Sequence, residues 1–206
     1  MNELIAKIEQ WAEDRNIIKG SKPIDQAMKL FSEFGELADN VGKGRDCRDD
    51  IGDVFVVLTI IGKQTDIGMW ESIKDTINAN YEEDVCSDWD DLDLDQESIV
   101  SFDELVENAN EFSTMKQNIV ELGSKMTDLF YIHDELNGEF DDYLLDCSVL
   151  LGAIAIGNNT TLEECVQIAY NDIKDRKGLM FNGVFIKESD PAYASVVASI
   201  EENYNA

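Results

Sequence analysis

Two pairs of carboxylates stand beside strongly apolar sequence near the start of the chain. Glu33 and Glu36 form one pair, and Asp50 and Asp53 form the other. Residues three positions apart share a helix face, so each pair presents two carboxylates in one direction. Such charges repel one another unless a cation is bound, and oxygen donors on two rigid helices suit Mg²⁺. The alternative is that all four are solvated surface acids in a chain rich in Asp and Glu.

A basic cluster lies far downstream, in the stretch NDIKDRKG. Lys174, Arg176 and Lys177 are three of only 16 positive residues, and Asn171 stands close by. Lys and Arg bind phosphate oxygens and neutralise charge that develops during phosphoryl transfer. The alternative is a favourable placement of positive charge at the end of a helix. The acidic side chains would supply the metal ligands of a metal–phosphate site, and the basic side chains would bind its phosphate oxygens.

Helical periodicity dominates the elements that must position these groups. A short turn joins the two acidic stretches, which predicts antiparallel neighbouring helices. Ser21 is a predicted N-cap with Pro23 in the first turn, and Ser101 and Thr161 each begin a capping-box pattern. No stretch alternates convincingly as a strand would. Together these patterns predict an all-α bundle of about seven or eight helices. The helices are expected over residues 2–14, 21–41, 49–65, 68–81, 101–112, 115–136, 141–157 and 161–178.

A candidate internal repeat divides the chain into two helical halves. Setting Asp53 against Asp146 aligns two apolar helices, and it places Leu122 and Lys125 where the first half has Glu33 and Glu36. The second half has thus lost the acidic pairs but ends in the basic cluster. The predicted organisation is a first half with the acidic pairs, an acidic linker, a degenerate second half with the basic motif, and a tail. These segments are 1–81, 82–100, 101–190 and 191–206.

Composition narrows the classes of partner and compartment. The net charge of −28 makes direct binding to nucleic acid or to an anionic membrane unfavourable. The longest apolar run is too short to span a bilayer. Four separated cysteines and a single histidine disfavour a zinc site, and we expect a reducing cytoplasm. The acidic stretch 82–98 is interpreted as a solvated linker, with a calcium loop and a DNA-mimicking lure as alternatives.

Three stretches resemble a known family, the all-α nucleoside triphosphate pyrophosphohydrolases, and within it the MazG-like proteins of phages. The segments ELIAKIEQWAEDRNI and DQAMKLFSEFGELAD resemble the family's opening helices with their E-x-x-E motif. DDIGDVFVVL resembles the following E-x-x-D motif, and AYNDIKDRKGLMFNGVFIKESD resembles the C-terminal segment of the phage group. The resemblance covers roughly residues 1–80 and 147–190.

The resemblance implies Mg²⁺-dependent hydrolysis of a nucleotide to its monophosphate and pyrophosphate, with Mn²⁺ as a substitute ion. It implies that one of the acids, Glu33 or Glu36, also activates the attacking water. The implied metal ligands are Glu33, Glu36, Asp50 and Asp53. The implied substrate-binding residues are Asn171, Lys174, Arg176, Lys177, Gln26 and Trp11, the last two in the base pocket and Trp11 equally explained as core.

Two departures from the family pattern leave alternatives open. Asp50 stands where the motif has Glu, and residues 81–146 interrupt the compact unit. Family members assemble as dimers or tetramers, so either a homodimer or a fused pseudo-dimer, as in the dimeric dUTPase-like relatives, is expected. If a phage encodes the chain, its compartment is the host cytoplasm. The rival hypothesis is a catalytically inactive relative whose acidic surface engages a basic partner.

Overall fold

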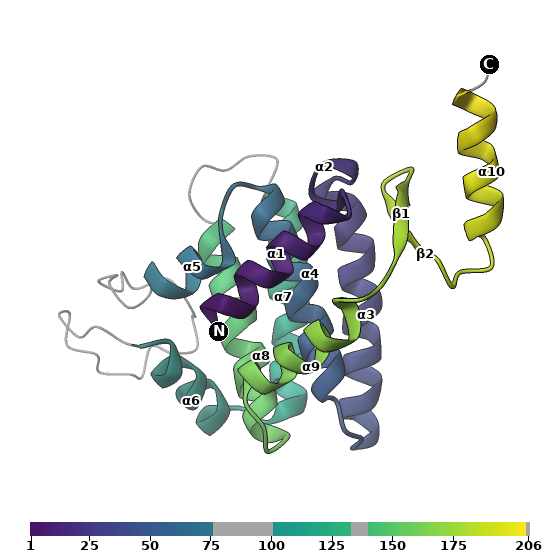
Figure 1. The fold of residues 1–206 in the computed structure, drawn as a ribbon. Coiled ribbons are helices and arrows are strands. Elements are labelled where there is room, and N and C mark those ends of the chain that lie inside the picture. Colours follow the sequence, from purple (N-terminus) through teal and green to yellow (C-terminus); the bar gives the residue numbers. More distant parts are fainter. Residues whose placement is uncertain (76–100, 133–139, 205–206) are drawn as a thin grey trace.

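The computed structural model describes residues 1–75, 101–132 and 140–204, and it is almost entirely helical. The predicted all-α bundle is therefore confirmed (Figure 1). The expected acidic linker 82–98 lies outside the described residues. The helices of the N-terminal part are α1 (Asn2–Asp14), α2 (Ile17–Gly20), α3 (Pro23–Lys43), α4 (Arg48–Gln64) and α5 (Met69–Asp75). Those of the C-terminal part are α6 (Phe102–Phe112), α7 (Met115–Ile132), α8 (Phe140–Gly157), α9 (Leu162–Ile173) and α10 (Tyr193–Tyr204).

Local signals explain where several helices begin and end. Ser101 and Thr161 accept the backbone N–H of the residue three positions on, as their capping-box patterns predict. Gly44 ends α3 in the left-handed conformation that glycine tolerates best. The predicted cap at Ser21 is wrong: α3 is capped one residue later, at Lys22, whose backbone N–H donates to the Asp25 carboxylate at 2.8 Å.

The core is built around the two apolar helices. In α4 nearly every side chain from Ile51 to Gly62 is buried, and α8 is buried along most of its length. Helix α3 packs against α4 as α7 packs against α8, while α9 lies against α4 and α5 lies against α8. The first half therefore contacts the second through both apolar helices. This reciprocal arrangement is what a fused pseudo-dimer would have, although the duplication itself stays a prediction.

Two C-terminal elements were not predicted. Strands β1 (Gly178–Phe181) and β2 (Val184–Lys187) form an antiparallel hairpin, and α10 occupies most of the expected tail. The hairpin contacts α2 of the first half, so the end of the second half returns to the first. Figure 1 shows α10 standing beyond the hairpin, away from the bundle. Within the described residues, none of the helices is long and apolar enough to cross a membrane.

Candidate functional site

A cavity of about 330 Å³ opens between the N-terminal part of α3, α4 and the β-hairpin. It combines a charged end with an apolar end. Its charged and polar lining residues are Asp25, Gln26, Lys29, Ser32, Glu33, Asp53, Arg176 and Lys187. Its apolar lining comes from Trp11, Ile17, Met28, Val56, Val57, Ile60, Ile173, Val184 and Phe185, with Gly183 at the hairpin turn. Of the ten predicted site residues, five line this cavity: Glu33, Asp53, Arg176, Gln26 and Trp11.

Two carboxylates form the acidic part of the charged end. Glu33 is only 6% exposed and forms an ion pair with Lys29, one helical turn earlier. Burial raises the pKa of Asp53 to about 7, and the negative charges of Glu33 and Asp49 act in the same direction. The cations Lys29 and Arg176 oppose this shift without cancelling it. The chain thus holds an acid at the cavity wall whose ionised form is disfavoured until positive charge arrives.

Three cations face these carboxylates from three different elements. Lys29 comes from α3, Arg176 from the segment after α9, and Lys187 from β2. Lys29 is paired with Glu33 and Arg176 is paired with Asp172. Lys187 makes no ion pair within the described part of the chain. Burial and the neighbouring cations lower the pKa of Lys187, against the opposing charges of Glu33 and Asp53.

The other end of the cavity is aromatic. The rings of Trp11 and Phe185 meet edge to face, with centroids 6.2 Å apart, and the Arg15 guanidinium lies 5.0 Å from the Trp11 ring centroid. Gln26 is buried and donates through Nε2 to Ser21 Oγ at 2.8 Å, and the buried Trp11 Nε1 has no hydrogen-bond partner among the described residues. Such a wall offers stacking area and hydrogen-bonding capacity to a flat ligand.

The remaining predicted residues lie outside the cavity lining. Glu36 is exposed, although it is only one turn from Glu33. Asp50 accepts a hydrogen bond from Asn40 at 2.8 Å, and burial is the main cause that raises its pKa, with Glu33 adding to the shift. One member of each acidic pair therefore lines the cavity and the other does not.

Three residues of the basic cluster are also at the surface. Lys174 donates to Asn171 Oδ1 at 3.1 Å, and both side chains are exposed, as is Lys177. Arg176 is the member of the cluster that lines the cavity. The backbone around it is held by Arg15, which donates to the Arg176 carbonyl at 2.8 Å and to the Lys174 carbonyl at 2.9 Å.

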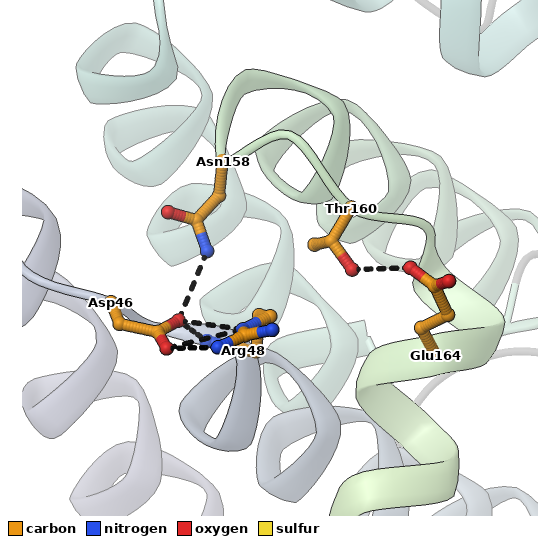
Figure 2. A network of polar contacts seen from close by, with 5 residues as sticks. All are labelled: Asp46, Arg48, Asn158, Thr160 and Glu164. Carbon is orange, nitrogen blue, oxygen red and sulfur yellow. Dashed lines mark hydrogen bonds and ion pairs between the residues drawn. The ribbon is translucent and has the colours of Figure 1, made fainter.

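Close helix packing explains how Arg176 comes near Asp53. At Gly52 an added Cβ would lie 2.2 Å from the Cys165 carbonyl oxygen, so only glycine lets α9 approach α4 this closely. At the far end of these helices, the α3–α4 turn meets the α8–α9 turn. There Asp46 binds Arg48 and accepts a hydrogen bond from Asn158, as Figure 2 shows.

The donor set bears on the expected magnesium ion. Glu33 and Asp53 offer hard carboxylate oxygens on two rigid helices, and Mg²⁺ is commonly held by one or two carboxylates plus waters and substrate phosphates. Across residues 1–75, 101–132 and 140–204, no three Asp, Glu, His or Cys side chains gather as a metal-binding group. The residues fit an ion shared with a substrate, and the four-carboxylate site stays a prediction.

Sequence reasoning missed Lys29, Phe185 and Lys187 as cavity residues. Phe185 and Lys187 depend on the hairpin, and the Asn182–Gly183 dipeptide between two apolar runs was the signal that could have predicted it, since it favours a tight hairpin turn. Both turn residues have positive φ, as that turn requires. Lys29 stands four residues before Glu33, a spacing typical of an ion pair along a helix.

Comparison with known proteins gives one informative match. A segment of 69 residues is 49% identical to an uncharacterized 18.2 kDa protein in the rep-hol intergenic region of Haemophilus phage HP1 (strain HP1c1). The match covers 32% of this chain and 42% of the phage protein, so the chain spans less than half the length of that relative. No family model matches the chain, and no solved structure matches it significantly. The similarity links the chain to a phage protein without assigning an activity.

Proposed function

We propose that this protein is a Mg²⁺-dependent nucleotide pyrophosphohydrolase that converts a nucleoside triphosphate, or a related nucleotide, to the monophosphate and pyrophosphate. The observation that carries the proposal is the lining of one cavity by three acids, three cations and an aromatic wall. Acids and cations at one end match a metal–polyphosphate group, and the aromatic end matches a base. The resemblance to MazG-like proteins supports the same chemistry.

Each part of the cavity has a role in this mechanism. Arg176 and Lys29 neutralise phosphate oxygens, and their charges oppose the negative charge that builds up as the bond breaks. Glu33 orients a water against the α-phosphorus and accepts its proton, after which the bond from that phosphorus to the bridging oxygen breaks and pyrophosphate leaves. Trp11 and Gln26 hold the base through stacking and hydrogen bonding.

Glu33 and Asp53 are the residues that would hold the metal from the protein side. A bound Mg²⁺ would polarise the phosphates and offset their charge. The same ion would offset the burial of Asp53, because positive charge beside a carboxylate favours its ionised form. The raised pKa of Asp53 is therefore consistent with a site that is complete only when a metal ion is bound.

The test is pyrophosphate release from a panel of dNTPs, NTPs and guanosine tetraphosphate, with and without Mg²⁺. We expect release from at least one nucleotide that depends on Mg²⁺ and is lost in Glu33→Gln and Asp53→Asn. Asp49→Asn is the matched control, because Asp49 is exposed on the same helix and lies outside the cavity lining. Absence of release from every nucleotide would overturn the proposal and favour the inactive binding protein.

A further inference from the structure

We infer that Lys187, carried over the cavity by the β-hairpin, is a polyphosphate-binding residue, and that docking of the hairpin turn against α3 sets its position. The inference rests on the proposed function in one respect, that the ligand carries a phosphate chain. It adds a binding residue and a positioning element that the acidic and basic motifs do not contain. The carrier is the β1–β2 hairpin, which packs on α2 and supplies one wall of the cavity.

Lys187 differs from the other cavity cations in having no ion-pair partner among the described residues. Lys29 is paired with Glu33 and Arg176 with Asp172, whereas Lys187 makes no ion pair with the described residues. Lys187 is exposed and lines the cavity, so its ammonium group is open both to solvent and to a ligand. An ammonium group left unpaired at a cavity wall is free to bind the phosphate oxygens of a ligand.

The turn of the hairpin fits closely against the start of α3. Asn182 and Gly183 have φ of 50° and 80°, and an added Cβ at Gly183 would lie 2.6 Å from Asp25 Oδ2. The Asp25 carboxylate in turn accepts a hydrogen bond from the Lys22 backbone N–H. A side chain at position 183 must therefore displace either the turn or the Asp25 carboxylate, and its positive φ adds backbone strain to the turn.

The hairpin connects this turn directly to the binding residue. Lys187 lies four residues after Gly183 and pairs with Gly178 at the open end of the hairpin. An added Cβ at Gly178 would lie 2.3 Å from the Ile186 carbonyl oxygen, so the two strands are as close there as glycine allows. A shift of the turn is therefore passed along a short, tightly paired ribbon to Lys187.

The first test measures binding of inorganic tripolyphosphate by calorimetry, in the presence of Mg²⁺ and without any nucleotide. We expect Lys187→Ala to weaken binding about tenfold and Lys187→Arg to retain it within about threefold, because one charge-assisted contact is lost or kept. Lys116→Ala, at an exposed position on α7, should bind as the unaltered protein does. Unchanged binding in Lys187→Ala, or no binding by the unaltered protein, would overturn the inference.

The second test addresses the hairpin turn. Gly183→Ala should weaken tripolyphosphate binding severalfold while the thermal unfolding midpoint of the bundle stays within a few degrees, since the change is confined to the hairpin. Asn182→Gly is the matched control, because glycine accepts the same positive φ and adds no atoms. Equal binding by Gly183→Ala and Asn182→Gly would show that the turn does not position Lys187.

These outcomes are separable from those of the proposed function. Tripolyphosphate binding that depends on Lys187, without turnover of any nucleotide, would retain the binding residue and reject the enzyme. Turnover of a nucleotide that is indifferent to Lys187→Ala, together with unchanged tripolyphosphate binding, would retain the enzyme and reject the inference.

Discussion

The apolar helices α4 and α8 each carry an aspartate at the position where the two halves align, and the two aspartates lie in different electrostatic settings. Asp53 of α4 shares a cavity wall with the buried Glu33, so burial and a like charge both raise its pKa. Asp146 of α8 forms an ion pair with Lys125 at 2.8 Å, and the pKa of Asp146 is raised to about 6 by burial against that cation. At the position aligned with Glu33, the second half has the fully buried Leu122.

The difference separates a site that needs a ligand from one that is complete within the protein. An acid paired with Lys125 has its countercharge built in, and it gains nothing from a cation in solution. An acid beside another acid is destabilised until a cation or a basic ligand arrives. We therefore expect Asp53 to take part in ligand binding and Asp146 to have a structural role.

Converting the first half to the pattern of the second should have the largest effect. Glu33→Leu removes the buried carboxylate and introduces the residue found at 122. We expect pyrophosphate release to fall at least a thousandfold, about 4 kcal/mol in transition-state stabilisation. The measurement is the initial rate on whichever nucleotide the unaltered protein hydrolyses best. Leu122→Val, a small change in the buried core of the second half, should alter the rate little, and an equal loss in both would remove the distinction between the halves.

Removing the countercharge in the second half should destabilise the fold. Lys125→Met leaves Asp146 buried without its ion-pair partner, which costs about 3 kcal/mol in the free energy of unfolding at pH 7. The cost should shrink at pH 5, because the carboxyl is then protonated and carries no charge. Urea unfolding at the two pH values measures both quantities.

Lys116→Met is the control for this second change, since Lys116 is exposed on the same helix. A loss in Lys125→Met that is the same at pH 5 and pH 7 would point to lost packing rather than to an unpaired acid. The Lys125 ammonium lies 5.8 Å from the centroid of the Tyr143 ring. The expected loss of about 3 kcal/mol therefore includes some loss of packing against this ring.

Asp53 should show the opposite sign of effect. Its folded-state pKa of about 7 exceeds the ordinary value of 3.8, so the folded state binds the proton more tightly and stability falls as pH rises between these values. Asp53→Asn should therefore be about 2 kcal/mol more stable than the unaltered protein at pH 8 in the absence of divalent cations, about half of what the full pKa difference would give because the side chain is partly exposed, and about equal to it at pH 4. Urea midpoints in EDTA measure this, and an equal gain in the exposed Asp49→Asn would contradict the assignment to position 53.

Much of the helical framework was readable from the sequence because its signals are local. The capping boxes at Ser101 and Thr161, the glycine-ended α3 and the apolar α4 each depend on residues within a few positions of one another. The hairpin was missed because its strands are only four residues long, too short for a clear alternation. The helix α10 was missed because it falls in a short segment after Pro191.

The candidate site was readable only in part, because spacing gives a helix face but not its surroundings. The i, i+3 rule placed Glu33 and Glu36 together, yet one is buried at the cavity and the other is exposed. What decides between them is the approach of α4 and of the hairpin, which come from other parts of the chain. The same limit hid Lys187, whose relation to Asp53 depends on a hairpin that returns from the second half.

The smallest predicted effect concerns Glu36. Its spacing from Glu33 predicts a metal ligand, whereas its exposure places it outside the cavity lining. Its carboxylate can reach an ion bound by Glu33 and Asp53 only from the solvent side. We expect Glu36→Gln to raise the Mg²⁺ concentration for half-maximal pyrophosphate release about tenfold, about 1.4 kcal/mol, with little change in the rate at saturating Mg²⁺. A complete loss of activity that excess Mg²⁺ cannot restore would place Glu36 on a level with Glu33, and this exposed acid would then have to turn inward when the metal binds.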